Sequence, residues 1–545
     1  MDSKKITKLS EDYFGFMASA YPVMCLSDEF YFFPRASQAI QYIKCLDSLD
    51  KHKIEQVIFH IKTLKQSLDK LKKGGMDLET FIDWQLLKTS MTGFLREFEQ
   101  VKIWQSDPNI YLKIIIMGIE QIINKLSMVK MDIGEVLSSR VKQIPRLLNE
   151  AKVNLKEVPL LYRETAVKLT EVIIYYLKYQ SSQSLNKNLI HPELIKFSKM
   201  AIQSLVDFKQ FLKKRLGSKE FIKDREILEN LLTGSFSYKR DLGEIFEIAS
   251  DEYQMTKAQL KKVANQIQPS LSWQKILSNY KLKAKNTKEL LSLYSTQILN
   301  LKDFLIRCNL MDIPQIQDIN VLQTPFYLAP IRASASYSCP LTTNQKESAF
   351  FYVSVGFEKN ERVRKRVWEN IHQEYIFVTA HETYPGHHLL DSIRRDIKNP
   401  IRQQIESVLF YEGWASYAER LIDQFGYLDD PRQRLVGLRR QAWRAIRAKL
   451  DVGIRIRKIK LSDAERELRW LGYGSSRVRA MLRHYVLTYG YQLCYTIGKF
   501  EIERLKEKFA TRIGMKNFHN CLLTGGQLPF DLIKKRMERI CQKDS

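Results

Sequence analysis

Long stretches without proline limit the folds open to this chain more than any other feature. Proline is absent from residues 35–106 and again from residues 193–268. Apolar residues in these stretches recur every three or four positions, as at Ile202, Leu205 and Phe208. Proline disrupts helix interiors, and this spacing places apolar side chains on one face of a helix. We therefore predict that the N-terminal half consists of long helices.

The pattern changes between residues 313 and 344, where four prolines cluster and the helical periodicity lapses. Residues 349–357 follow, rich in aromatic and β-branched side chains, and are the best candidate for a strand. Helical periodicity then returns over residues 370–381 and 405–425, and residues 431–545 are mostly helical as well. The expected fold is mainly α, with a small β element before the helix that carries His381.

The chain is basic, with 87 Lys and Arg against 61 Asp and Glu and a formal net charge of +26. Such a charge attracts anions, including nucleic acids, anionic membranes and acidic substrates. The basic runs are interleaved with apolar residues, as on the solvated face of a helix. The chain contains no zinc-finger, RNP or helix-turn-helix signature, so a non-enzymatic nucleic-acid-binding protein is the weaker alternative. We expect no specific nucleic-acid partner.

The seven cysteines form no CxxC pair, which argues against a disulfide framework or a thiolate zinc site and favours a reducing compartment. The first 20 residues contain acidic side chains and no apolar core of a signal peptide. No run of 18 apolar residues occurs either. We expect a cytoplasmic protein without a membrane partner, and the sequence carries no signal for its oligomeric state.

Three of the nine histidines lie within eight residues, at 381, 387 and 388, and Glu382 directly follows the first. A zinc hydrolase needs imidazole or carboxylate ligands, an open position for water, and a nearby carboxylate as general base. In the common HExxH helix the second ligand stands four residues after the first, but here Pro385 occupies that position. A Pro385-Gly386 distortion of the helix can bring His387 beside His381, and His388 is the other candidate.

Two motifs resemble those of a known family. Its HExxPGH motif is matched by His381, Glu382, Pro385, Gly386 and His387, and its EGWAxYxE motif by residues 412–419. The chain thus resembles the domain of unknown function 885 family, whose members are regarded as zinc-metallopeptidase-like. The resemblance covers residues 231–545, whereas residues 1–230 show no family motif. We interpret these ranges as a family-like region and a helical N-terminal region, which can together form one bilobed domain.

The resemblance implies a large helical, zincin-like fold and a role for each residue of the motifs. His381, His387 and Glu412 would hold Zn²⁺, and Glu382 would act as the general base. Glu419 would orient an imidazole from behind the ligands, and His388 would lie outside the ligand set. The chain departs from the family pattern at Tyr489, Asn520 and Arg455, where proline, aspartate and histidine are usual; these changes bear on the substrate pocket and leave the ligands intact.

Cleavage of an amide also requires a donor for the developing oxyanion, and the candidates are Tyr485, Tyr495, His484 and His519. Arg444 and Arg447 are candidates for binding a substrate carboxylate, and the strand at residues 350–355 for binding a peptide by edge addition. We expect a zinc-dependent peptidase with a peptide or small amide as substrate. The main alternative within enzymes is a zinc amidohydrolase that acts on a non-peptide amide.

Overall fold

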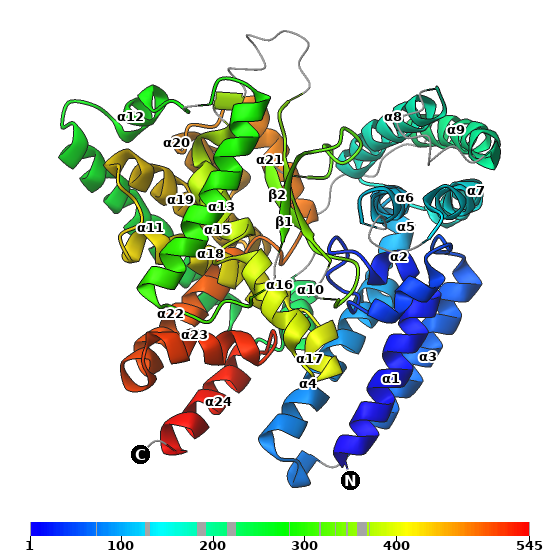
Figure 1. Cartoon of the computed structure of the whole chain (residues 1–545), viewed down its shortest axis with the longest axis horizontal. Helices are drawn as coiled ribbons and strands as arrows, with labels where there is room; N and C mark the ends of the chain where they lie inside the picture. The colour runs from blue at the N-terminus through cyan, green and yellow to red at the C-terminus, as the bar shows by residue number, and fades with distance from the viewer. Residues whose placement is uncertain are drawn as a thin grey trace.

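Helices make up most of the chain, as the periodic, proline-free stretches predict. Figure 1 shows the computed structural model, which describes residues 2–543 except 72, 126–130, 183–191, 215–224, 283, 316–317, 333, 345–346, 357–367 and 370. The N-terminal α-helices are α1 Asp2–Ala20, α2 Pro22–Cys25, α3 Lys51–Asp69, α4 Leu78–Leu95, α5 Ile103–Ser106, α6 Asn109–Glu120, α7 Ile133–Asn154, α8 Leu160–Ser182, α9 Pro192–Lys214 and α10 Arg225–Asn230.

The second half of the chain is also helical, with helices before and after the three strands of a small sheet. Its helices are α11 Leu242–Ile267, α12 Trp273–Asn279, α13 Thr287–Cys308, α15 Tyr375–Glu382, α16 His387–Asp396, α17 Pro400–Gln404, α18 Val408–Gln424, α19 Pro431–Arg455, α20 Leu461–Trp470, α21 Ser475–Leu487, α22 Cys494–Ile513, α23 Met515–Thr524 and α24 Phe530–Lys543. The predicted helices at 370–381 and 405–425 correspond to α15 and α18, and residue 370 lies outside the described residues.

Several long helices begin at an acidic or amide cap, which explains where the periodic stretches start. Asp50 accepts hydrogen bonds from the backbone N–H groups that open α3, and Asp77 does the same for α4. Asp241 and Asn286 cap α11 and α13 in the same way. A side-chain oxygen at this position satisfies N–H groups that have no partner within the helix.

The sheet has three strands in the order β1-β3-β2. β3 (Ala349–Val353) is the predicted strand, and all five of its residues are buried; residue 357 lies outside the described residues. β1 (Ile319–Gln323) pairs with it in parallel, and β2 (Ala335–Ser338) pairs with it in antiparallel. Residues 313–344, where the helical periodicity of the sequence lapses, therefore supply the two outer strands. The predicted peptide-binding edge on β3 is wrong, because β3 is paired on both sides.

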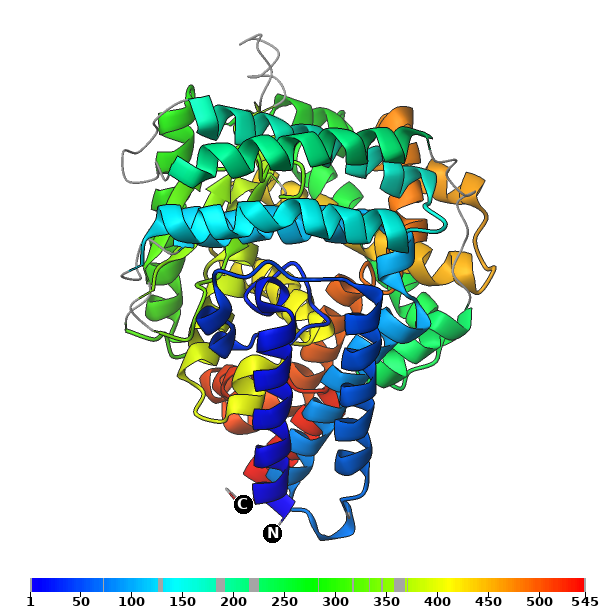
Figure 2. The same ribbon diagram turned by 90° about the vertical axis from the view of Figure 1, so that its right-hand side faces the viewer.

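The sheet lies between the N-terminal helices and the helices of the second half, as Figure 1 shows. Figure 2 shows α6 to α9 running across the molecule above the upright helices α1 and α3. One continuous cluster of buried apolar residues extends from Ile6 to Met537 and so includes both halves. Among the described residues, no helix has both the length and the apolar character needed to cross a membrane.

Candidate metal centre

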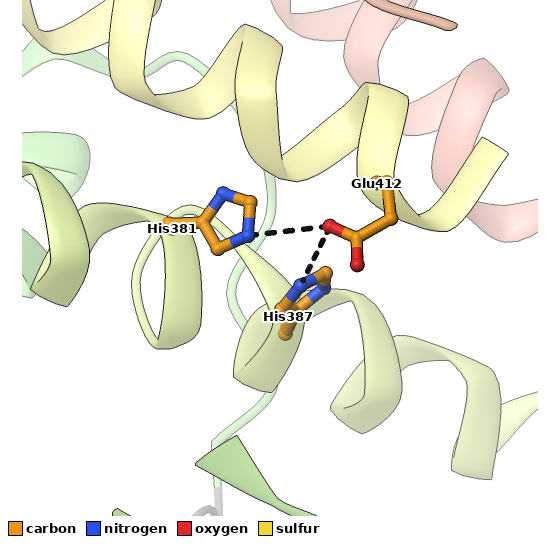
Figure 3. Close-up of side chains that lie close together, drawn as sticks. All are labelled: His381, His387 and Glu412. Carbon is orange, nitrogen blue, oxygen red and sulfur yellow. Dashed lines mark ion pairs between the residues drawn. The ribbon is translucent and has the colours of Figure 1, made fainter. Parts of the chain in front are cut away.

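Three helices bring two imidazoles and a carboxylate together (Figure 3). His381 lies near the end of α15, His387 opens α16, and Glu412 lies in the first half of α18. The Nε2 atoms of the two histidines are 3.3 and 3.6 Å from the same atom, Oε2 of Glu412. All three side chains are buried. The structure thus brings His387, and not His388, to the predicted ligand group.

The chain turns sharply between the two histidines, as Pro385 and Gly386 predict. α15 ends at Glu382 and α16 begins at His387, so residues 383–386 form no helix. The indole N–H of Trp414 in α18 donates to the carbonyl oxygen of Pro385 at 2.8 Å, which ties this turn to the helix of the third candidate ligand. With the helix interrupted here, two histidines six positions apart face the same atom, Oε2 of Glu412.

The spacing of these atoms fits a tetrahedral zinc ion. Nitrogen and oxygen ligands lie about 2.1 Å from zinc, so two ligands of a tetrahedral site are about 3.4 Å apart. The two distances to Glu412 Oε2, 3.3 and 3.6 Å, match that separation. Oε2 is buried and has no hydrogen-bond partner among the described residues. A buried carboxylate oxygen without a donor is costly, and a cation at this point would satisfy it.

A second carboxylate, Glu419, lies about two turns after Glu412 in α18 and faces the other ring nitrogen of His381. Its Oε1 atom is 3.1 Å from Nδ1 of His381. It also accepts from Arg440 Nη2 at 2.9 Å and from Arg444 Nη1 at 2.7 Å. Arg444 Nη2 also lies 3.2 Å from Nδ1 of His381. In the tautomer whose Nδ1 donates to Glu419, Nε2 keeps its lone pair and faces Glu412 Oε2. The orienting role expected of Glu419 stays a prediction.

The charges of the group favour a cation. Burial and Arg444 lower the pKa of His381, but the adjacent carboxylates of Glu412 and Glu419 outweigh both effects, so its pKa is raised. Burial alone would raise the pKa of both carboxyls; contact with the imidazoles and arginines instead holds both pKa values well below their usual range. Both carboxylates are therefore ionised at neutral pH, and the acceptors that attract a proton to His381 also attract a divalent ion.

Glu382, the expected general base, is half-buried at the end of α15. The backbone N–H of Tyr337 in β2 donates to its Oε2 atom at 2.9 Å. This bond fixes the carboxylate at one oxygen. Because β2 is an outer strand, this N–H lies at the edge of the sheet. At Tyr337 that edge is therefore already paired with Glu382.

A cavity of about 540 Å³ adjoins the candidate ligands. Its walls come from both halves of the chain: residues 28–32, 97–113 and 162 on the N-terminal side, and the sheet, α15, α18 and residues 484–495 on the other. His381, Glu382 and Glu412 all line it. The N-terminal helices therefore form part of the wall of the space that a substrate would enter.

Tyr495, the predicted oxyanion donor, lines the same cavity, and its ring is stacked 6.2 Å from that of His381. Burial and the Glu412 carboxylate raise its pKa, so its hydroxyl stays protonated at neutral pH and can donate. Arg447, predicted to bind a substrate carboxylate, lies behind the cavity wall. Its guanidinium is 4.7 Å from the centre of the Tyr495 ring and donates through Nε to Gln492 at 2.7 Å.

Two histidines among the predicted site residues lie away from the cavity. His388 is fully buried, with its ring packed between those of Tyr337 and Tyr384. His519 donates from Nδ1 to the carbonyl of Leu310 at 2.8 Å, and its Nε2 is 2.9 Å from the hydroxyl of Tyr417. The structure thus places His519 in the core, and its predicted contact with substrate is wrong for this arrangement.

Sequence reasoning missed two tyrosines at the site. The ring of Tyr411 stacks on His387 with centres 3.8 Å apart and planes 10° from parallel. The hydroxyl of Tyr491 donates to Oε1 of Glu412 at 2.6 Å. Tyr411 directly precedes the candidate ligand Glu412, and Tyr491 lies within the family-like region at residues 231–545, but neither position distinguishes them among 26 tyrosines.

The fold and the site together define a mainly helical protein with a buried His-His-Glu centre beside a cavity. The chain belongs to the family described as "Bacterial protein of unknown function (DUF885)", which it matches over residues 35–537. This range includes most of residues 1–230, where motifs alone show no resemblance. No curated protein matches the chain.

Two solved structures are similar to the chain along their whole length. One is described as "a putative lipoprotein of unknown function" from Shewanella oneidensis; it is 17% identical with a TM-score of 0.74, covering 98% of this chain and 99% of that one. The other is a "putative lipoprotein" from Colwellia psychrerythraea, 15% identical with a TM-score of 0.70 and full coverage of both chains. At these identities the likeness shows the fold.

Proposed function

We propose that the protein is a zinc-dependent hydrolase of the peptidase type, with zincin-like chemistry. One observation carries this proposal: the Nε2 atoms of His381 and His387 converge on an unpartnered oxygen of Glu412 at a spacing that suits tetrahedral zinc. Zinc bound there would polarise a carbonyl group and make a water nucleophilic at neutral pH.

Glu382 is suited to act as the general base by its carboxylate group and by its position. It follows a candidate ligand directly and lines the cavity, and Tyr337 holds one of its oxygens in place. We assign its other oxygen, Oε1, as the atom that takes the proton of the attacking water and passes it to the leaving amine. Tyr495, protonated and on the cavity wall, would donate to the oxyanion that forms on the carbonyl.

The cavity supports a short peptide or small amide as substrate. Its volume, about 540 Å³, lies within the range of about 300–1,000 Å³ in which proteins hold small ligands. Tyr31 and Tyr162 of the N-terminal half line it together with His381. A folded protein does not fit such a space, whereas a chain of a few residues does.

Metal analysis of the purified protein tests the proposal. We expect about one zinc ion per chain, lost in His381→Ala and kept in His388→Gln, because His388 lies outside the ligand group. A folded wild-type protein that binds no zinc at micromolar metal contradicts the proposal. Loss of zinc in His388→Gln with retention in His387→Ala would show that the ligand set is wrong.

Turnover of a library of short peptides tests the reaction. Glu382→Gln should keep its zinc and lose turnover by at least about a hundredfold, since general-base catalysis contributes about 10²–10⁴-fold. Glu406→Gln is the matched control, because Glu406 lines the same cavity and has no part in the proposed chemistry. Full activity of Glu382→Gln contradicts its role. Cleavage of non-peptide amides without any peptide cleavage would favour the amidohydrolase.

A further inference from the structure

The two oxygens of the Glu412 carboxylate have different surroundings. Oε1 accepts a hydrogen bond of 2.6 Å from the hydroxyl of Tyr491. Oε2 faces His381 and His387 and has no hydrogen-bond partner among the described residues. One oxygen is therefore held by a phenol, and the other points to the position that both imidazoles share.

Tyr491 is held in place by its two neighbours in the chain. The backbone N–H of Gly490 donates to both carboxylate oxygens of Asp451, at 2.9 and 3.1 Å. Gln492 accepts from Arg447 Nε at 2.7 Å and donates from its side-chain nitrogen to the hydroxyl of Thr488 at 3.0 Å. Asp451 and Arg447 both belong to the long helix α19, so the segment that carries Tyr491 is fixed to a rigid element.

The close crossing of α18 and α22 adds to this arrangement. A Cβ atom at Gly413, next to Glu412, would lie 2.5 Å from the Cα atom of Gly498 in α22. Two glycines thus allow the backbones of these helices to touch. The start of α22, three residues after Tyr491, is thereby kept beside the helix that carries Glu412.

A carboxylate can bind a metal through one oxygen or through both, and the choice changes the number of positions left for water and substrate. A hydrogen bond to one oxygen favours binding through the other. We propose that Tyr491 is a positioning residue that keeps Glu412 a one-oxygen ligand of the metal. This inference rests on the proposed function, because it assumes that the His-His-Glu group binds a metal.

Tyr491→Phe removes the hydroxyl and keeps the ring, so Oε1 of Glu412 becomes free to join the metal. The full-length protein is loaded in separate samples with Zn²⁺ and with Co²⁺. Zinc affinity is measured by competition with a chelator, and the coordination of Co²⁺ by its visible absorption, which weakens as the ion passes from four to five ligands. Tyr162→Phe is the matched control, because Tyr162 lines the same cavity but donates to the carbonyl of Leu487.

We expect Tyr491→Phe to change zinc affinity by about 10–100-fold and to weaken the cobalt absorption, while Tyr162→Phe leaves both unchanged. A change in affinity accompanied by an unaltered cobalt spectrum overturns the one-oxygen role. Wild-type affinity and spectrum in Tyr491→Phe overturn the inference and leave the zinc site standing. A wild-type protein that binds neither ion overturns the proposed function, and this inference with it.

Discussion

Gly386 packs so closely against the backbone of His381 that a Cβ atom at position 386 would overlap the His381 carbonyl oxygen. The carbonyl oxygen of Ala380 also lies within reach of such an atom. The chain can turn back on the end of α15 only because residue 386 has no side chain. His381 is one partner in this contact, and His387 directly follows the other. The spacing of the two candidate ligands therefore depends on it.

Gly386→Ala should therefore separate His381 from His387. We expect loss of stoichiometric zinc and a fall in the free energy of unfolding of about 1–3 kcal/mol, as overpacking commonly causes. Gly15→Ala in α1 is the matched control, because a Cβ atom there has no neighbour within 4 Å. Zinc analysis and chemical denaturation measure the two effects, and a Gly386→Ala protein with full zinc content would show that the backbone contact is not needed.

The helices and the turn at the site could be predicted from local sequence. Apolar periodicity and the absence of proline mark the helices, and Pro385 with Gly386 marks the break between α15 and α16. These features act through neighbouring residues, so the sequence displays them directly. The ligand roles, the zinc ion and the cytoplasmic location stay predictions.

The outer strands could not be predicted, because their pairing comes from distant parts of the chain. β1 alternates only weakly in burial, and β2 has four residues, two of them serine. Both form strands because each pairs with β3, whose aromatic residues are buried. The prolines near these strands indicated only that the helical pattern lapses there.

The partners of the site residues could not be predicted either, because they too come from distant parts of the chain. Tyr491 lies 79 positions from Glu412, and nothing local to it indicates that contact. Arg447 was expected to face a substrate, but it donates to Gln492. His519 appeared as a polar residue in a family-like segment, yet it is fully buried with both ring nitrogens in hydrogen bonds.

The orienting role of Glu419 can be separated from its contribution to stability. Glu419→Gln removes the charge that faces His381, Arg440 and Arg444. Breaking one side of a buried ion pair costs about 3–5 kcal/mol, and loss of an orienting carboxylate weakens metal binding by about 10–100-fold. Glu501→Gln is the control, because Glu501 is also buried and pairs with Arg240 and with none of the candidate ligands.

We expect both Glu419→Gln and Glu501→Gln to unfold more easily, and only Glu419→Gln to bind zinc more weakly. Thermal unfolding of the metal-free proteins measures the first effect, and chelator competition the second. Equal zinc affinity in the two variants would mean that Glu419 serves only the stability of the ion-pair network.

Low pH should lower the free energy of unfolding of the metal-free protein, because buried histidines resist protonation in the folded state. Burial lowers the pKa of His372 and His519 from 6.5 to about 4. Between these values the unfolded chain binds more protons than the folded one, so the free energy of unfolding falls as pH falls from 6.5 to 4. Asp47 acts in the opposite sense, because burial raises its pKa from 3.8 to about 6 and its contribution falls as pH rises through that range.

His519→Asn should lose the part of this dependence that comes from His519. The variant should be less stable than the wild type at pH 7, and the difference should shrink by about 3 kcal/mol by pH 4, because only the wild type must protonate the imidazole of His519. Urea unfolding of metal-free protein at both pH values measures the change. His52→Asn, at a side chain that is 87% exposed, is the control. A difference for His519→Asn that stays constant with pH contradicts the prediction.

Tyr495→Phe should lower turnover without removing the metal. The hydroxyl of Tyr495 is our assigned donor to the oxyanion, and loss of such a donor commonly lowers kcat by about 10²–10³-fold. The ring remains to pack against His381 and Arg447, so the fold and the zinc content should persist. Tyr162→Phe again controls for the loss of a hydroxyl from the cavity wall. A lower kcat with an unchanged KM in Tyr495→Phe alone supports a role in the transition state, whereas a rise in KM alone would place the phenol in substrate binding.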